Sequence, residues 1–240
     1  MSYLFVVPTI MGRPQLEISN VEKLATEFPD SRILFVSNVE DEDFSNYIPT
    51  KNNIIKKVSN KKYSISKALN LGINSLEEDY FVFVQSDVLI NKPAINFFTE
   101  IHQTYPNVGV IGIQQHSNFN KFHKQIPHPN ASMFNVLWTD AVMFIHKNVI
   151  NKLGPFNEDY LGDKESQEYC YRAIEEGYQN ILIQKHQDKQ IQWSHTSTAF
   201  ESKIKHNPQE YLKVKNYSKQ LFRERWSGDS WENHQSYLFK

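Results

Sequence analysis

The sequence predicts an α/β fold, a three-layer αβα sandwich in which helices cover both faces of a mostly parallel central sheet. Nearly continuous apolar runs of strand length recur along the chain, and segments with helical spacing of apolar residues separate the first three runs. Strands that are apolar on both sides are typical of parallel sheets, because helices bury both faces of such a sheet.

The expected strands lie at residues 3–10, 32–38, 80–86, 108–114 and 141–147. One helix is expected within residues 14–30, where apolar residues recur near helical spacing until Pro29, and a second within residues 64–80. This alternation of strands and helices implies right-handed crossovers and a Rossmann-like core. We interpret the acidic stretch 40–43 and the lysine-rich stretch 51–62 as solvated loop or helix faces.

Composition limits the classes of protein to consider. A chain of 240 residues with 40% hydrophobic content can bury one substantial core. With 26 basic and 27 acidic residues, its net charge of -1 gives no overall field that would favour nucleic acid, so we expect no nucleic-acid partner. No run approaches the roughly 18 apolar residues of a membrane-spanning helix, which leaves at most peripheral membrane contact.

The single cysteine, Cys170, excludes an intrachain disulfide framework, and the N-terminal segment lacks the features of a secretory signal. Both observations lead us to expect a reducing, cytoplasmic compartment. A helix is predicted from about Lys164 to Gly177, and Cys170 falls on its apolar side, which favours packing over nucleophilic chemistry. Glu168 and Arg172 stand four residues apart on this helix and are expected to form a surface salt bridge.

Polar residues stand where the expected strands end, and ligands of open α/β sheets bind outside the carboxyl ends of the strands. The predicted crevice is therefore bordered by three strand tips: Pro8 and Thr9; Ser37 and Asn38; and Gln85, Ser86 and Asp87. For the last tip an ordinary turn is the alternative, because Ser and Asp stop strands in many proteins.

Neither glycine-rich phosphate-binding fingerprint follows the first strand, where the sequence reads VVPTIMGRPQ. A phosphate in this crevice would need another source of positive charge. A divalent metal held by Asp87 is the natural candidate, because Mg²⁺ and Mn²⁺ take carboxylate oxygens while sharing the ion with a diphosphate.

A series of short motifs follows in a fixed order between residue 3 and about residue 200. They are Pro8-Thr9, Asn70-Leu71-Gly72-Ile73, Gln85-Ser86-Asp87, Leu153-Gly154-Pro155-Phe156-Asn157-Glu158, Glu165-Ser166-Gln167-Glu168 with Arg172, Gly177-Tyr178, and His195-Thr196-Ser197-Thr198. In order and spacing they resemble the motifs of the family-two-type glycosyltransferases, which have the GT-A fold. No single motif is specific, and the resemblance depends on the whole series.

The sequence departs from this pattern at three positions. Gln85 stands where the family has the first Asp of its Asp-x-Asp motif, Ser166 where it has the Asp of a Glu-Asp pair, and Leu69 where it often has an arginine. Asp87 retains the last carboxylate of the metal motif, which in the family usually binds the ion. Gln85 could still accept a hydrogen bond from the ribose or a metal-bound water through its amide oxygen.

The resemblance implies that residues 1–200 form a GT-A domain that binds a nucleotide sugar, and that residues 201–240 form a helical, aromatic extension packed on it. It implies an inverting glycosyltransferase that uses Mn²⁺ or Mg²⁺ and moves a sugar from a nucleotide-sugar donor, a UDP-sugar, to a hydroxyl of a glycan or glycolipid acceptor. Whether the chain forms a homodimer stays open. In the extension, Trp226, Trp231 and Tyr237 could stack on a sugar or dock a terminal helix onto the core.

Two other functions stay open at this stage. A sugar-nucleotide-binding protein without turnover is one, because Gln85 and Ser166 replace carboxylates of the family. The second is a nucleotidyltransferase, although this class would want a glycine-rich basic loop that PTIMGRPQ does not supply.

The resemblance also assigns roles to the metal and base residues. Asp87 and His195 would hold the metal, and the alternative for His195 is a hydrogen-bonded core histidine beside Trp193. Glu165 would receive the proton of the acceptor hydroxyl, with Asp163 as the main rival. The alternative for Glu165 is plain stabilisation of the helix dipole.

Donor contacts are assigned in the same way. Ser37 and Asn38 stand where the family commonly reads the base and ribose, and Thr9 and Arg13 would lie beside the nucleoside. Asp140 stands near a position where the family usually has a glycine. It could hydrogen-bond sugar hydroxyls, narrow the pocket, or be an ordinary carboxylate at the start of a strand.

Overall fold

The computed structural model describes residues 1–38, 40, 42–113, 124–195 and 207–226. The strands are β1 (Tyr3–Thr9), β2 (Arg32–Ser37), β3 (Ile54–Val58), β4 (Tyr80–Val84), β5 (Val88–Ile90), β6 (Val108–Ile113), β7 (Lys124–Ile126), β8 (Ala131–Val136), β9 (Val142–His146), β10 (Gln179–His186) and β11 (Trp193–His195). The helices are α1 (Pro14–Glu27), α2 (Glu42–Asn46), α3 (Ile65–Ile73), α4 (Lys92–Thr104), α5 (Lys147–Leu153), α6 (Glu165–Glu175) and α8 (Pro208–Trp226).

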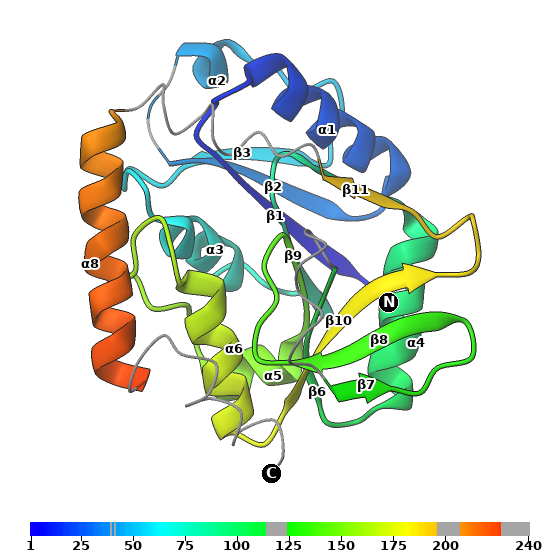
Figure 1. The fold of residues 1–240 in the computed structure, drawn as a ribbon. Coiled ribbons are helices and arrows are strands. Elements are labelled where there is room, and N and C mark those ends of the chain that lie inside the picture. The colour runs from blue at the N-terminus through cyan, green and yellow to red at the C-terminus, as the bar shows by residue number, and fades with distance from the viewer. Residues whose placement is uncertain (39, 41, 114–123, 196–206, 227–240) are drawn as a thin grey trace.

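The strands form a 9-stranded sheet in the order β3-β2-β1-β4-β9-β6-β10-β8-β7, with a separate 2-stranded sheet of β11 and β5 (Figure 1). β1 to β4 run parallel to one another. β9 runs antiparallel between β4 and β6, and β8 runs antiparallel to β10. The predicted, mostly parallel sheet is thus confirmed, with two strands reversed.

Two apolar clusters lie on opposite faces of the sheet, because successive side chains of a strand point to opposite sides. Phe5 and Val7 of β1 belong to the cluster that α1 and α4 cover. Leu4 and Val6 belong to the cluster that α3, α5 and α6 cover. The three-layer αβα sandwich expected from the sequence is therefore present.

Two of the motifs prove to fasten α3 in place. A Cβ at Gly72 would lie 2.4 Å from Val6 Cγ2, so only glycine allows α3 to approach β1 this closely. The side chain of Asn70 accepts a hydrogen bond from Phe156 N (2.8 Å) and donates one to Phe156 O (2.9 Å). The Asn-x-Gly-Ile helix and the turn at Phe156 are thus joined, far from each other in sequence.

The interpretation of residues 51–62 as solvated faces is wrong for part of this stretch, because residues 54–58 form β3 at the edge of the sheet. Lys56 and Lys57 interrupt the apolar pattern that would otherwise predict a strand here. Charged residues are common on edge strands, where lysine discourages pairing with another chain.

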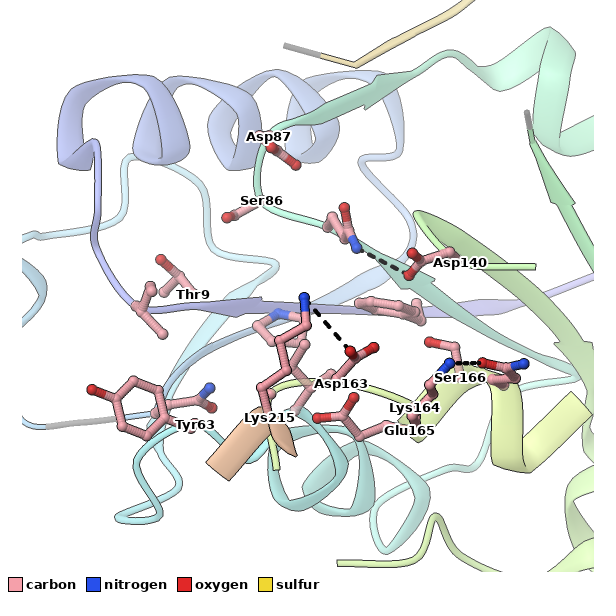
Figure 2. A pocket seen from close by; sticks show the side chains of 18 of the residues that line it. Thr9, Tyr63, Ser86, Asp87, Asp140, Asp163, Lys164, Glu165, Ser166 and Lys215 are labelled. Carbon is pink, nitrogen blue, oxygen red and sulfur yellow. Dashed lines mark hydrogen bonds and ion pairs between the residues drawn. The ribbon is translucent and has the colours of Figure 1, made fainter. Parts of the chain in front are cut away.

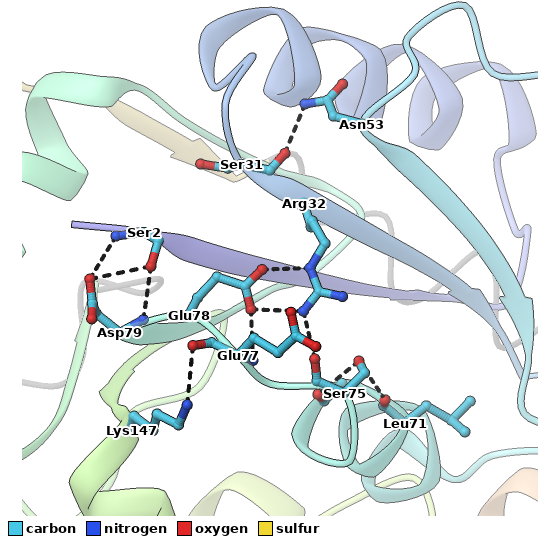
Figure 3. A network of polar contacts seen from close by, with 11 residues as sticks. Ser2, Ser31, Arg32, Asn53, Leu71, Ser75, Glu77, Glu78, Asp79 and Lys147 are labelled. Atoms are coloured by element: carbon cyan, nitrogen blue, oxygen red, sulfur yellow. Dashed lines mark hydrogen bonds and ion pairs between the residues drawn. The ribbon is translucent and has the colours of Figure 1, made fainter.

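A polar network joins the N-terminal ends of the strands, at the edge opposite the predicted crevice (Figure 3). Arg32, at the start of β2, donates to both carboxylate oxygens of Glu78, from Nε at 2.5 Å and from Nη2 at 2.9 Å, and also to the carbonyl of Ser75. The backbone and hydroxyl of Ser2 donate to Asp79 just before β4. These contacts fasten β1, β2 and β4 to one another.

Helix α8 packs on the body formed by the earlier residues. Phe222 and Trp226 contact Tyr171 of α6 in a buried cluster that also holds Leu137 and Tyr160. Trp226 therefore docks the helix, which was one of its two expected roles. Trp231 and Tyr237 lie outside the described residues. No helix in the described part of the chain is both long and apolar enough to cross a membrane.

Candidate active site

A cleft of about 330 Å³ opens at the carboxyl ends of β1 and β4, and the start of α6 and part of α8 form its other side (Figure 2). The predicted site residues that line it are Pro8, Thr9, Asn38, Gln85, Ser86, Asp87, Asp163 and Glu165. Parallel strands bring their carboxyl ends to one edge of a sheet, which is why tips far apart in sequence meet here.

Three predicted residues do not line this cleft. Ser37 is fully buried within the sheet, and Arg13 touches the site region through its backbone N–H, which donates to Glu17 Oε1 at 2.9 Å. His195 is not among the lining residues, although its side chain lies beside that of Asp87. The donor contacts expected of the Ser37 and Arg13 side chains would therefore require these side chains to move.

Asp87 and His195 are brought together by the small sheet. β11 pairs antiparallel with β5, and this register places His195 opposite Val88, next to Asp87. His195 Nε2 lies 3.5 Å from Asp87 Oδ2. Asp87 is 4% exposed and lines the cleft, so little of its surface reaches solvent outside it.

This pair fits a divalent ion as a partial ligand set. Two ligands about 2.1 Å from one octahedral ion stand roughly 3 Å apart, close to the separation of the two side chains. One carboxylate and one imidazole leave positions for water and for substrate phosphates, as Mg²⁺ and Mn²⁺ sites commonly do. Within the described residues, no group of three or more His, Cys, Asp or Glu side chains could hold a metal.

Glu17 was missed by sequence reasoning, although it lines the cleft and is 2% exposed. The Thr9 hydroxyl donates to its carboxylate and accepts from Met11 N at 2.8 Å. The carboxylate of Glu17 thus connects the tip of β1 to the first turn of α1. The signal was present in the sequence, because an acidic residue in the first helical turn often reaches back to a free N–H.

The start of α6 forms the opposite wall. Lys164, which precedes Glu165, has a left-handed backbone with φ 76°, a conformation that costs a residue other than glycine about 1 kcal/mol. The helix then runs to Glu175, and Gly177 follows with φ 85°, so the predicted helix is confirmed to within two residues. Figure 2 shows Asp163, Lys164 and Glu165 together on this side of the cleft.

Glu165 is a buried carboxyl group, only 5% exposed. Burial, helped by the charges of Asp163 and Asp140 and opposed by backbone hydrogen bonds, raises its pKa to about 8. Its Oε1 has no hydrogen-bond partner among the described residues. A carboxyl group with this pKa and an unsatisfied oxygen in a cleft is typical of functional sites.

Two residues of α8 complete the wall, and sequence reasoning missed both. Lys215 Nζ lies 3.6 Å from Asp163 Oδ2 (Figure 2). The Tyr211 hydroxyl donates to the carbonyl of Gly162 at 3.0 Å. Nothing in the local sequence distinguishes Lys215 from the other lysines of α8, because its place depends on how this helix docks.

Gln85 and Asp140 meet across neighbouring strands. Gln85 Nε2 donates to Asp140 Oδ1 at 3.3 Å, and the backbone N–H of Gln85 donates to the carbonyl of Ala141 at 2.9 Å. Both side chains line the cleft. The amide at position 85 therefore has a carboxylate beside it, supplied by the segment before β9.

The Glu168–Arg172 pair is buried rather than on the surface, which corrects the expectation. Glu168 is 1% exposed, and Arg172 Nε lies 3.0 Å from its carboxylate. Arg172 also donates to the carbonyls of Leu153 and Pro155, so it fixes the turn after α5 against α6.

Cys170 is fully buried, in agreement with the predicted packing role.

No protein-family model matches the chain, and no curated protein sequence does. Solved structures match it over nearly its whole length. TarS from S. aureus superposes with a TM-score of 0.56 at 16% identity, covering 100% of this chain and 46% of that chain. TarS 1-349 in complex with UDP-GlcNAc gives a TM-score of 0.57 at 16% identity, covering 99% of this chain and 70% of that one.

A mannosyltransferase from Pyrobaculum calidifontis, PcManGT, in complex with GDP-Man and Mn²⁺ gives a TM-score of 0.58 at 12% identity, covering 99% of this chain and 84% of that one. This chain has the fold of these glycosyltransferases. The GT-A-type fold that the motifs predicted is thereby confirmed. At such identities the likeness concerns the fold, and the chain spans about half of the length of the TarS chain.

Proposed function

We propose that the chain is an inverting, metal-dependent glycosyltransferase that moves a sugar from a nucleotide sugar, a UDP-sugar, to a hydroxyl of a glycan or glycolipid. The observation that carries this proposal is one cleft with two chemically different ends. Asp87 lies at one end, where it would hold a metal together with the adjacent His195, and the buried carboxyl group of Glu165 lies at the other.

At the donor end, the nucleoside would lie against Thr9 and Asn38, which line the cleft at the tips of β1 and β2. Asp87 and His195 would hold Mn²⁺ or Mg²⁺, which when bound would neutralise the negative charge of the diphosphate. PcManGT, which has a similar fold, is in complex with GDP-Man and Mn²⁺, and this supports the proposal.

At the acceptor end, Glu165 would take the proton of the attacking hydroxyl. The acceptor oxygen forms its bond to the anomeric carbon as the bond from that carbon to the diphosphate oxygen breaks, and the proton moves to the carboxylate of Glu165. With a pKa of about 8, the carboxylate form grows as the pH approaches 8, where it is a strong enough base for this step. Asp163 is the rival base, held 3.6 Å from Lys215.

A sugar-nucleotide-binding protein without turnover is the second candidate, because Gln85 and Ser166 remove carboxylates that the resembling family uses. Melting-temperature measurements with UDP-GlcNAc and GDP-Man, with and without Mn²⁺, test donor binding, since a ligand of the native state raises the melting temperature. Slow release of nucleoside diphosphate to water then distinguishes a transferase from a binder. A chain that no nucleotide sugar stabilises would contradict both functions.

A further inference from the structure

The cleft holds a polar pair that the proposed mechanism does not use, Gln85 on the tip of β4 and Asp140 before β9. The register of the two antiparallel strands pairs Val84 with Val142, and the hydrogen bond from Gln85 N to Ala141 O continues this pairing beyond the strand. This register places Ala141 opposite Gln85, and Asp140, the residue before Ala141, lies close enough to accept a hydrogen bond from Gln85 Nε2 at 3.3 Å.

Both side chains line the cleft in which the proposed function would place the donor sugar. The transferred sugar would lie between the leaving diphosphate and the base, because the acceptor hydroxyl attacks in line with the bond that breaks. Asp87, Asp140 and Glu165 all line the cleft, and in the view of Figure 2 Asp140 lies at a level between the other two. Asp140 and Glu165 line the same cleft, and the charge of Asp140 raises the pKa of Glu165.

The hydrogen bond between Gln85 and Asp140 determines which of their atoms can bind a ligand. The Gln85 Nε2 group donates to Asp140, which identifies the amide nitrogen as the side that faces the carboxylate. The amide then presents its oxygen as an acceptor, and a carboxylate is an acceptor only. Such a pair matches hydroxyl groups, which donate, and its negative charge opposes an anionic sugar.

We propose that Gln85 and Asp140 bind hydroxyl groups of the donor sugar and select a neutral sugar over a uronic acid. This inference rests on the proposed function and adds a sugar-binding part to its donor site. Position 85 has no carboxylate of its own, and Asp140, in the segment before β9, supplies one 3.3 Å from the Gln85 amide nitrogen. A role limited to fastening the two strand tips is the competing explanation.

Calorimetric titrations of the full chain with UDP, UDP-glucose and UDP-glucuronic acid in the presence of Mn²⁺ separate these roles, with GDP and GDP-mannose titrated in parallel. Asp140→Asn should lower the affinity for the neutral sugar nucleotide roughly tenfold, the loss expected for a hydrogen bond to a charged group. The affinity for the nucleoside diphosphate alone should stay within about twofold. Discrimination against the uronic acid should shrink, because the repelling charge is gone.

Asp30→Asn makes the same chemical change at an exposed residue and should alter none of these affinities. An equal loss of affinity for UDP and UDP-glucose in Asp140→Asn would overturn the inference, because it would indicate a fastening role. Unchanged affinities would overturn it as well. A wild-type chain that binds no nucleotide and no nucleotide sugar would overturn the proposed function, and the inference with it.

Discussion

Glu165→Gln should remove most of the transfer activity and at the same time stabilise the fold. Glutamine has nearly the same size and resembles the protonated carboxyl group, but it cannot take a proton from an acceptor. If Glu165 is the base, turnover should fall by roughly 10²-fold or more while donor affinity persists. A residue that matters only for structure would not produce these two opposite effects.

The gain in stability follows from the raised pKa. Burial moves the pKa of Glu165 from 4.5 to about 8, so between these values the unfolded chain is ionised at this residue and the folded protein is not. The contribution of Glu165 to the free energy of unfolding is therefore fully present below pH 4.5 and is lost as the pH rises toward 8. At about 1.4 kcal/mol per pH unit, the loss reaches about 3 kcal/mol at pH 7 as an upper limit.

Urea unfolding at pH 4.5 and pH 7.5 measures this effect. Glu165→Gln should have nearly wild-type stability at the lower pH and a higher free energy of unfolding at the higher one. Turnover is followed as nucleoside diphosphate release, which in the wild type should rise with pH toward 8. Near-normal turnover in Glu165→Gln beside an inactive Asp163→Asn would contradict the assignment of Glu165 as the base and would assign this role to Asp163. If neither variant changes the rate, Asp140 becomes the next candidate.

Two further predictions concern stability. Arg32→Ala should lower the free energy of unfolding by about 1–3 kcal/mol, because it leaves the buried carboxylate of Glu78 without the guanidinium that binds both its oxygens. Urea unfolding measures this change, with Lys189→Ala at an exposed position as the control. An unchanged midpoint in Arg32→Ala would contradict the prediction. Burial, and then the charge of His146, lowers the pKa of His102 to about 4, so stability should be lost as the pH falls from 6.5 toward 4. His102→Gln should flatten this part of the stability curve in thermal unfolding, and an identical slope in both proteins would contradict the assignment.

The sequence predicted the parts of the fold that local patterns determine. β1, β2, β4, β6 and β9 were found because their apolar runs are nearly unbroken. β3 was missed because an edge strand has one solvated side and carries lysines. The reversal of β9 was not predicted either, since the direction of a strand depends on where the preceding segment of chain crosses the sheet, which no periodicity records.

The sequence likewise predicted the site residues that lie at strand ends, but not those that tertiary packing brings to the cleft. Thr9, Asn38 and Asp87 line the cleft because strand tips meet at one edge. The placement of His195 beside Asp87 came only from the resemblance to a family, because a short ladder between β5 and β11 creates it. Lys215 could not be predicted, since the docking of α8 through buried aromatic side chains brings it to the cleft.

The most direct test of the account is the dependence of donor binding on metal and on the two proposed ligands. Calorimetry with UDP-GlcNAc and GDP-Man, first with Mn²⁺ and then with a chelator, should show binding of one of them that needs the metal. Asp87→Ala and His195→Ala should each weaken this binding by at least about tenfold, with Asp30→Asn as the control, because each removes one of the two side chains held 3.5 Å apart. Equal affinity in both variants and the wild type, or binding that the chelator leaves unchanged, would contradict the proposed metal-dependent transferase.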